Sequence, residues 1–314
     1  MYTIGIDVGG MSLKFGLVDE NGKIISTTRV KTAVTPNEVI NDIIDRVNFL
    51  LKENNLDIKQ IKGIGIGLPG AADSTTGVVV HLPNIPGWTN IPLVEKLKEV
   101  FDTDIRISND ANVAALGEVI YGAAKDYNIA VMFTLGTGVG GGIIIDKKLF
   151  EGGFCRGAEL GHMTLIMNGE DCTCGRKGCV EAYASATALM KQTKEAMLKD
   201  PGSAMWKFVD GDIDKVDGRT AFECAKQGDE SANKVVDTYV SYIAESMLNM
   251  FNIFRPEAFI IGGGISAQGE YLTNKLKSYC EKFDYGYKGA PKTEILTAEL
   301  GNDAGIIGAA ALLA

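Results

Sequence analysis

The sequence has no long apolar run and no excess of positive charge. No hydrophobic stretch reaches the roughly 20 residues that a membrane-spanning helix needs, and the opening residues MYTIGIDVGG lack the basic segment of a signal peptide. The formal net charge of the 314 residues is −9, which argues against a surface for nucleic acid or anionic membranes. We therefore expect a cytoplasmic protein with neither nucleic acid nor membrane as a partner. The hydrophobic and charged fractions, 46% and 23%, are those of an ordinary globular chain.

Histidine and cysteine are scarce, with two and six residues, yet four of them gather in one short stretch. The stretch holds His162, Cys172, Cys174 and Cys179. Four soft or borderline ligands are what a closed tetrahedral zinc site needs, and the glycines between them let the chain fold back on a metal. Unrelated buried thiols or a disulfide are the alternatives. The pattern favours zinc but names no reaction, and Cys224 and Cys280 are expected to be ordinary thiols.

The N-terminal segment predicts a meander of three strands with a diglycine in its first turn. The strands are expected at residues 3–8, 13–19 and 23–30. Asp7 ends the first strand, Gly9 and Gly10 form the turn, and Lys14 follows it. Backbone N–H groups of such a turn can cradle phosphate oxygens, and the carboxylate can hold Mg²⁺. A plain tight hairpin is the alternative that this motif alone leaves open.

Two helix starts can be located in the first half of the chain. Thr35 and Glu38 form a capping box around Pro36, which predicts a helix to about residue 54. Asn109 and Asp110 follow a strand at residues 104–108 and precede a helix of small residues. A polar turn between a strand and a helix is where α/β folds place functional side chains.

The pattern of strand, glycine turn and strand returns at residues 129–146, about 127 residues after its first appearance. A third strand runs into glycines at residues 258–266. Two such hairpins, each opening an α/β half, suggest an internal duplication with a cleft between the halves. Residues 200–218 are expected to be a polar loop, and the small residues of 303–313 a helix that returns to the N-terminal domain. We expect a smaller domain of residues 1–117 plus 303–314 and a larger one of residues 118–302, which carries the zinc segment 157–183.

Read together, these motifs resemble the ROK family of sugar kinases, and most closely its bacterial ATP-dependent glucokinases. The resemblance covers essentially the whole chain and rests on DVGG…K (7–14), GLPG (67–70), NIPGW (84–88), SNDANVAALGE (108–118), LGTGVGGG (135–142), GAELGH (157–162), CTCGRKGCVEAY (172–183), IIGGGIS (260–266) and DAGIIGAA (303–310). It implies the two-domain α/β fold of actin, Hsp70 and hexokinase, which is ribonuclease H-like with an interdomain cleft. It also implies transfer of the γ-phosphoryl group of ATP to the 6-hydroxyl of glucose.

The same resemblance implies a role for each matching residue. Asp110 is the catalytic base. The sugar is held by Gly70, Asn84, Asn109, Asp110, Glu159, His162 and Glu181. ATP and Mg²⁺ are bound by Asp7, Gly9, Gly10, Ser12, Lys14, Thr134, Gly136, Thr137, Gly138, Gly262, Gly263 and Gly264. Structural zinc is bound by His162 together with the three cysteines, and a homodimer or homotetramer is expected.

One residue departs from the family pattern. Met11 stands after the diglycine, where many members have Thr, so either Ser12 or the backbone amides would meet the phosphate. Another hexose as substrate, such as mannose, fructose or an N-acetyl-hexosamine, is an alternative, as is polyphosphate as donor. A sugar-sensing repressor or a catalytically inactive sugar-binding protein are two further classes. The acidic charge and the chain's start at a strand argue against the repressor, and Asp110 with its glycine turns argues against the inactive protein.

Overall fold

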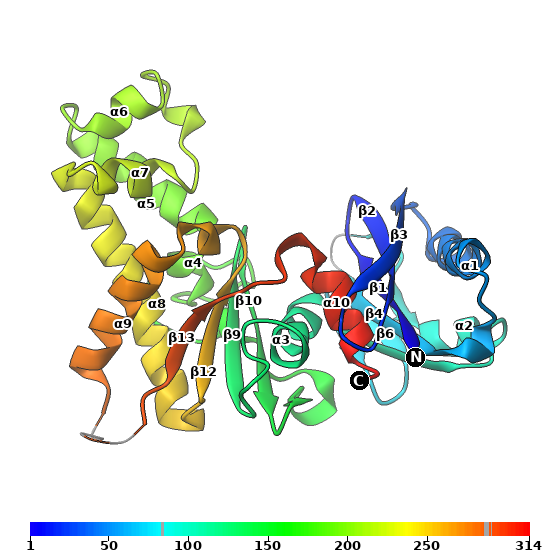
Figure 1. Ribbon diagram of the computed structural model, residues 1–314. Coiled ribbons are helices and arrows are strands. Elements are labelled where there is room, and N and C mark those ends of the chain that lie inside the picture. The colour runs from blue at the N-terminus through cyan, green and yellow to red at the C-terminus, as the bar shows by residue number, and fades with distance from the viewer. Residues whose placement is uncertain (83–84, 286–288, 290) are drawn as a thin grey trace. The chain divides into compact units, whose positions relative to one another are not determined.

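The computed structural model describes residues 1–82, 85–285, 289 and 291–314 (Figure 1). The chain forms two compact units. Unit 1 consists of Met1–Asn128, Gly142–Ala158 and Glu299–Ala314, and unit 2 of Ile129–Gly141 and Glu159–Ala298.

Unit 1 is built on a sheet of five strands. They are β1 (Tyr2–Val8), β2 (Ser12–Val18), β3 (Ile24–Lys31), β4 (Ile61–Leu68) and β8 (Asp104–Asn109), in the order β3-β2-β1-β4-β8. The first three strands pair antiparallel, which confirms the predicted meander, and β1, β4 and β8 pair parallel. β1 and β4 are buried along most of their length, as strands covered on both faces are.

Local sequence signals set the first helix of unit 1, α1 (Pro36–Glu53). The Thr35 N–H donates to Glu38 Oε2 at 3.1 Å and the Glu38 N–H donates to Thr35 Oγ1 at 3.4 Å, so the predicted capping box is confirmed. The unit also contains α2 (Leu93–Lys98), α3 (Asp110–Ile120) and a small sheet of β5 (Ala71–Asp73), β6 (Val78–His81) and β7 (Thr89–Ile91). This small sheet was not predicted from the sequence.

Helix α10 (Ala304–Ala311) packs backbone to backbone against the sheet of unit 1. A Cβ atom added at Gly5 of β1 would collide with the carbonyl oxygen of Ile306, and one at Gly65 of β4 with that of Ala309. On its other side, Gly308 lies against the Val113 carbonyl of α3. Glycine at these positions lets the helix approach closely. Glu299–Ala314, which includes this helix, belongs to the same compact unit as Met1–Asn128.

The second sheet repeats the strand order of the first. Its strands are β9 (Ala130–Leu135), β10 (Val139–Ile145), β11 (Lys148–Leu149), β12 (Ala258–Gly262) and β13 (Glu294–Thr297), in the order β11-β10-β9-β12-β13. The boundary between the units falls within β10. In both sheets a hairpin strand lies beside the first strand, and later strands of the half add in parallel on its other side. The duplication inferred from the two glycine-rich hairpins therefore has a counterpart in topology.

The helices of unit 2 are α4 (Glu181–Ala184), α5 (Ala186–Lys199), α6 (Ala204–Phe208), α7 (Thr220–Lys226), α8 (Glu230–Phe254) and α9 (Glu270–Phe283). The expectation of a continuous loop over residues 200–218 is wrong, because α6 and a 3₁₀ turn at Ile213–Lys215 lie there. Ser203 caps α6 through the Met205 N–H, and Met205 is fully buried. The cap at Ser203 and the burial of Met205 therefore favour a short helix within this otherwise polar stretch.

These compact units differ from the domain boundaries predicted at residues 117 and 302. A buried carboxylate, Glu118, connects the segments concerned. It accepts hydrogen bonds from the N–H groups of Ala123 at 2.9 Å, Glu299 at 3.1 Å and Leu300 at 2.8 Å. Residues following α3 and residues preceding α10 therefore pack together in unit 1.

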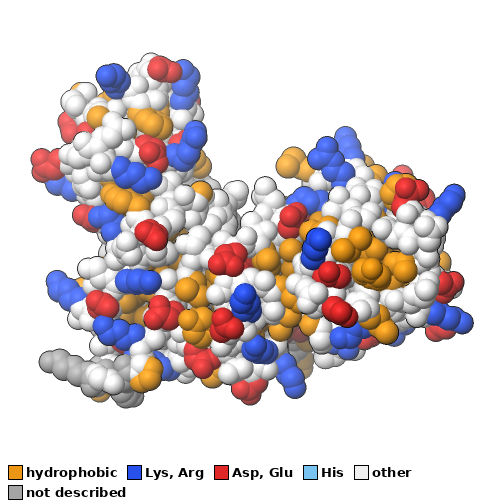
Figure 2. All heavy atoms as spheres, in the orientation of Figure 1, with side chains coloured by type: hydrophobic (Ala, Val, Ile, Leu, Met, Phe, Trp, Pro, Cys, Tyr) orange, Lys and Arg blue, Asp and Glu red, His pale blue; other side chains and the backbone are white. Residues whose placement is uncertain are grey.

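In the described part of the chain, no helix is both long and apolar enough to cross a membrane. On the face drawn in Figure 2, Lys and Arg side chains alternate with Asp and Glu side chains.

Candidate active site and metal centre

The start of α3 is fixed by Asn109, which caps the helix. Its Oδ1 accepts hydrogen bonds from the N–H groups of Ala111 at 2.9 Å and Asn112 at 3.3 Å, and its Nδ2 donates to the Gly70 carbonyl at 3.2 Å. Asx residues favour this position because their side chains satisfy the free N–H groups of the first turn. Asn109 thereby joins the carboxyl end of β8 to the loop after β4, and it brings the predicted sugar-binding residue Gly70 beside it.

Asp110 is the first residue of α3, and its acidity is altered. The side chain reaches solvent, but burial of the carboxyl group raises its pKa to about 6, and repulsion by the Asp7 carboxylate adds to the rise. A hydrogen bond of 2.8 Å from the Ala111 N–H to Oδ1 acts in the opposite direction. A carboxylate with a raised pKa is a stronger base than an ordinary aspartate and is still mostly ionised at neutral pH.

The β1–β2 turn places the predicted phosphate-binding residues of unit 1 next to this carboxylate. The Lys14 ammonium lies 3.0 Å from Asp7 Oδ2. The Gly9 N–H donates to the Ser12 carbonyl at 3.1 Å and closes the turn around Gly10. Met11, which departs from the family pattern, points outward with 88% of its surface exposed.

Two residues that the sequence analysis did not single out complete this turn. Gly305 of α10 packs against the Asp7 carboxyl group, where any larger residue would collide with it. Thr32, at the end of β3, donates its hydroxyl proton to the Gly9 carbonyl. Both depend on segments distant in sequence, so no local pattern announced them.

The β9–β10 turn of unit 2 is held by the segment that begins at α4. The Gly136 N–H donates to the Gly138 carbonyl at 3.0 Å inside the turn. From outside, the Ala186 N–H donates to the Gly136 carbonyl and the Thr187 hydroxyl to the Thr137 carbonyl, each at 2.8 Å. The predicted residues of this phosphate turn therefore lie together in a firmly held loop.

The third glycine stretch lies at the same edge of the sheet as the second. Gly262 ends β12 opposite Thr134 of β9, and Gly263 with φ 78° packs against the Leu135 backbone. Gly264 opens the 3₁₀ turn Gly264–Gln268. Because β9 and β12 are parallel, both glycine turns lie at the carboxyl ends of strands, the edge where α/β sheets bind ligands.

The four candidate zinc ligands come together in unit 2. Their ligand atoms all lie within 4.8 Å of one another. The Sγ atoms of Cys174 and Cys179 are 3.7 Å apart, and Cys172 Sγ lies 3.7 Å from His162 Nδ1. Tetrahedral zinc with Zn–S bonds of ~2.3 Å places two sulfurs about 3.8 Å apart, so the four residues fit such a site. A disulfide needs an S–S distance of ~2.05 Å, and Cys172, Cys174 and Cys179 are all free thiols in the structure.

The four residues lie in one segment, residues 162–179, which we call the metal loop. It contains few helical residues and is shaped by backbone hydrogen bonds. The Cys172 N–H donates to the Arg176 carbonyl at 2.9 Å, and Thr164 forms a β-bridge with Cys179. Gly175 and Gly178 adopt φ angles of 86° and 79°, which favour glycine. The Arg176 guanidinium donates to the His162 carbonyl at 3.2 Å, so the loop also orients its histidine ligand.

The predicted sugar-binding residues of unit 2 differ in how many hydrogen bonds their side chains form within the protein. Glu159 is exposed, and its carboxylate has no hydrogen bond within the described residues. His162 presents Nδ1 to the cysteines, which leaves Nε2 for another partner. Glu181 accepts from the Val139 N–H at 3.0 Å through Oε2 and from the Thr173 hydroxyl at 2.9 Å through Oε1. Asn84, also predicted to hold the sugar, lies outside the described residues.

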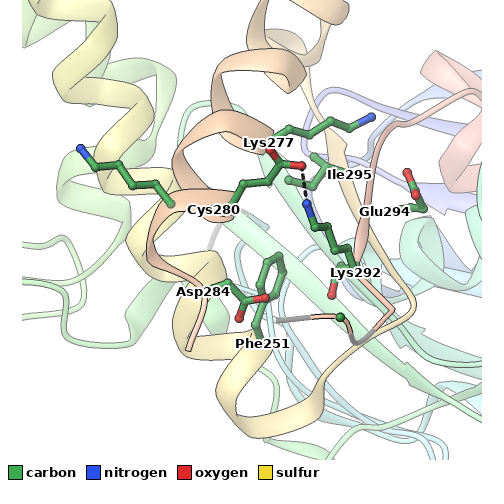
Figure 3. Close-up of a pocket in the computed structure, with 11 residues that line it drawn as sticks. Phe251, Lys277, Cys280, Asp284, Lys292, Glu294 and Ile295 are labelled. Atoms are coloured by element: carbon green, nitrogen blue, oxygen red, sulfur yellow. Dashed lines mark hydrogen bonds and ion pairs between the residues drawn. The ribbon is translucent and has the colours of Figure 1, made fainter. Parts of the chain in front are cut away.

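A cavity of about 910 Å³ in unit 2 lies away from these groups (Figure 3). It is lined by α9, the end of α8 and the start of β13. Two ion pairs lie at its wall: Lys292 is 2.9 Å from Glu281, and Asp284 is 2.7 Å from Arg255. β13 begins opposite Ala258 at the start of β12, so the cavity lies at the amino ends of these strands, opposite to the glycine turns.

Residues 3–314 match the model of the ROK family. The chain belongs to the ROK family. Among its relatives is a glucokinase of Thermotoga maritima, 38% identical over 314 residues that cover 100% of this chain and 97% of the relative. A ROK glucokinase from Streptomyces griseus, solved in complex with glucose and AMPPNP, superimposes with a TM-score of 0.80 at 35% identity and 99% coverage of both chains. A xylose repressor of Bacillus spizizenii is 31% identical over 99% of this chain but extends further, since the match covers 77% of it.

Membership of the ROK family confirms the resemblance inferred from the motifs and the predicted fold class. The chain has the two-domain α/β fold of ROK sugar kinases, which is shared with actin and hexokinase.

Proposed function

We propose that this ROK-family protein is an ATP-dependent hexokinase that transfers the γ-phosphoryl group to the 6-hydroxyl of glucose and forms glucose 6-phosphate. The observation that carries the proposal is Asp110, a carboxylate of raised pKa placed at the start of α3 beside the diglycine turn. Full-length similarity to glucokinases at 34–38% identity supports glucose as the acceptor and ATP as the donor.

Asp110 acts as the base. Its carboxylate accepts a hydrogen bond from the attacking hydroxyl, orients that oxygen towards phosphorus and takes the proton as the P–O bond forms. The raised pKa suits this role, because the carboxylate remains ionised at neutral pH and binds the proton more strongly than an ordinary aspartate. Asn109 fixes the position of Asp110 by capping the same helix turn.

Charge on the transferred phosphoryl group is neutralised mainly by position and electrostatics, since the transition state is loose. The backbone amides around Gly9, Gly10 and Ser12 form one phosphate turn and those of Gly136–Gly138 the other. Lys14 adds a positive charge near Asp7. Two acidic side chains near each other, Asp7 and Asp110, are the oxygen donors that Mg²⁺ prefers, and Mg²⁺ bound there would offset phosphate charge.

Sugar hydroxyls are assigned to the side chains that keep hydrogen-bonding capacity. Glu159 and the Nε2 atom of His162 have no internal partner in the described chain, and each oxygen of Glu181 has a second lone pair. Asn109, Gly70 and Asn84 complete the proposed set. A site built in this way discriminates against sugars that lack a hydroxyl, because its polar groups would be left unpaired.

Zinc is assigned to the cluster of His162, Cys172, Cys174 and Cys179, whose separations fit tetrahedral coordination. The role is structural, because four protein ligands leave no open position. When bound, zinc would hold the metal loop closed. Glu159 precedes the first ligand by three residues and Glu181 follows the last by two, so the metal loop sets the position of both glutamates.

Two alternatives to a glucokinase come from the relatives of this chain. Kinases of other hexoses are the main alternative. A sugar-sensing regulator is a second one, because a xylose repressor is 31% identical to this chain over 99% of its length. We also propose a homodimer or homotetramer in the cytoplasm.

The test is a coupled assay of ADP release by purified protein with Mg-ATP and a panel of glucose, mannose, fructose and N-acetyl-hexosamines. We expect the highest kcat/KM with glucose. Polyphosphate replaces ATP in a parallel series to identify the donor. Absence of turnover with every sugar and both donors, in protein that contains zinc and is folded, would refute the kinase assignment.

A further inference from the structure

Residues 181–187, which follow the metal loop, hold the second phosphate turn through three hydrogen bonds. The Val139 N–H donates to the Glu181 carboxylate, the Ala186 N–H donates to the Gly136 carbonyl, and the Thr187 hydroxyl donates to the Thr137 carbonyl. Glu181 is two residues beyond Cys179, the last of the four metal-cluster residues. A direct chain of contacts therefore runs from the metal loop to the turn, all of it inside unit 2.

Glu181 is the junction of this chain. Its Oε2 accepts the Val139 N–H at 3.0 Å, and the carboxylate packs so closely on Gly138 that a Cβ atom there would collide with it. Its Oε1 accepts the Thr173 hydroxyl proton at 2.9 Å. Thr173 lies between Cys172 and Cys174 within the metal loop, so one carboxylate connects the loop with the turn.

Thr173 is the partner that can hold Glu181 Oε1 when the metal is bound. Cys172 Sγ also lies 3.8 Å from Oε1, but a cysteine that ligates zinc is a thiolate without a proton to donate. Thr173 is exposed and has no part in the hydrophobic core. Its hydroxyl can therefore be removed with little expected effect on folding.

We propose that Thr173 is a positioning residue that, through Glu181, keeps the Gly136–Val139 turn in its phosphate-binding form. The inference rests on the proposed function for its consequence in nucleotide binding, whereas its structural part does not. An ordered turn binds phosphate without first losing conformational freedom, so loosening it weakens nucleotide affinity. The metal loop thus contributes to ATP binding as well as to the sugar side of the site.

The test compares Thr173→Val, which keeps the shape and removes the hydroxyl, with Thr173→Ser, which retains it. Thr238→Val is the matched control, because Thr238 is an exposed threonine on α8 without a side-chain hydrogen bond in the described chain. For each protein we would measure zinc per chain, the Kd of Mg-AMPPNP without sugar, and hydrogen exchange of the Val139 amide.

We expect T173V to keep its zinc, to bind Mg-AMPPNP about 3- to 10-fold more weakly, and to exchange the Val139 amide faster. T173S and T238V should match the wild type in all three measurements. Unchanged Val139 exchange in T173V would overturn the proposal. So would zinc loss in T173V, because the hydroxyl would then serve the metal loop and not the turn. If the wild type binds no Mg-AMPPNP, the proposed function fails, and the exchange comparison still decides whether Thr173 holds the turn.

Discussion

The two glycine turns occupy the same place in two sheets of the same strand order, yet they are held in different ways. The β1–β2 turn lies among charged side chains, with Asp7 paired to Lys14 at 3.0 Å and Asp110 close enough to have its pKa raised by Asp7. The β9–β10 turn instead offers neutral backbone amides and carbonyls, and residues 181–187 hold it by hydrogen bonds. The two hairpins have the same place in their sheets, and they differ in the groups that surround them.

This difference suggests that unit 1 mainly affects the reaction step and unit 2 mainly affects binding. Unit 1 carries the proposed base and the charged groups around it, and their removal should lower turnover. Unit 2 carries the metal loop and the neutral turn, whose loosening should lower affinity. Each prediction below tests whether that division holds.

The largest effect is expected for Asp110→Asn in unit 1. Loss of a general base typically lowers turnover by ~10²–10⁴-fold, while glucose binding measured by calorimetry should persist because the amide keeps the shape. Asp102→Asn, an exposed aspartate before β8, is the matched control and should leave kcat unchanged. A kcat within threefold of wild type, under conditions where chemistry limits the rate, would remove Asp110 from its role.

The next effect concerns the metal loop of unit 2. Cys174→Ser should lower zinc below one per chain and weaken glucose affinity by roughly 10- to 100-fold, the range seen when supports of a metal site are removed. Cys155→Ser replaces a partly exposed cysteine outside the cluster and should retain full zinc. Elemental analysis that finds no zinc in wild-type protein prepared without chelator would contradict the metal assignment itself.

Glu159→Gln tests whether sugar binding and zinc binding within unit 2 depend on different residues. Bonds to a charged group are worth ~1.5–3 kcal/mol, so the glucose KM should rise about 10-fold or more, with the ATP KM and zinc content nearly unchanged. Glu195→Gln, an exposed glutamate on α5, is the control. Loss of zinc in E159Q with normal glucose affinity in the metallated fraction would mean that Glu159 supports the metal.

The smallest effect is a shift along the pH axis. With the pKa of Asp110 raised from 3.8 to about 6, the ionised base is lost as pH falls, so kcat/KM should drop about tenfold between pH 7 and pH 5. An aspartate of ordinary pKa would show almost no change over that range. A flat profile, with protein shown to be folded at pH 5, would place Asp110 outside the rate-determining proton transfer.

Local signals predicted the parts of this fold that are built locally. The capping box at Thr35, the diglycine hairpin and the strand before Asn109 each depend on a few adjacent residues, and each lies where the sequence indicated. The metal cluster belongs with them, because its four residues are close in sequence and their spacing already restricts the geometry.

Features that depend on distant partners escaped the sequence. Helix α6 exists because Met205 finds a buried place, and the units join residues 118–128 with 299–300 because Glu118 binds their backbone. The contacts of Thr32, Thr173 and Thr187 are similar, since an isolated threonine carries no pattern. The candidate site was therefore predictable in its reactive groups and not in the residues that position them.

The glycine contacts of α10 bear on the order in which the chain can fold during synthesis. Gly5 of β1 and Gly65 of β4 lie directly against the backbone of α10, which follows them by more than 200 residues in the chain. All of unit 2 is made before that helix leaves the ribosome. One face of the N-terminal sheet therefore stays uncovered until α10 has been synthesised. Unit 2 can fold before then, so unit 1 is expected to complete its folding after unit 2 although most of it is translated first.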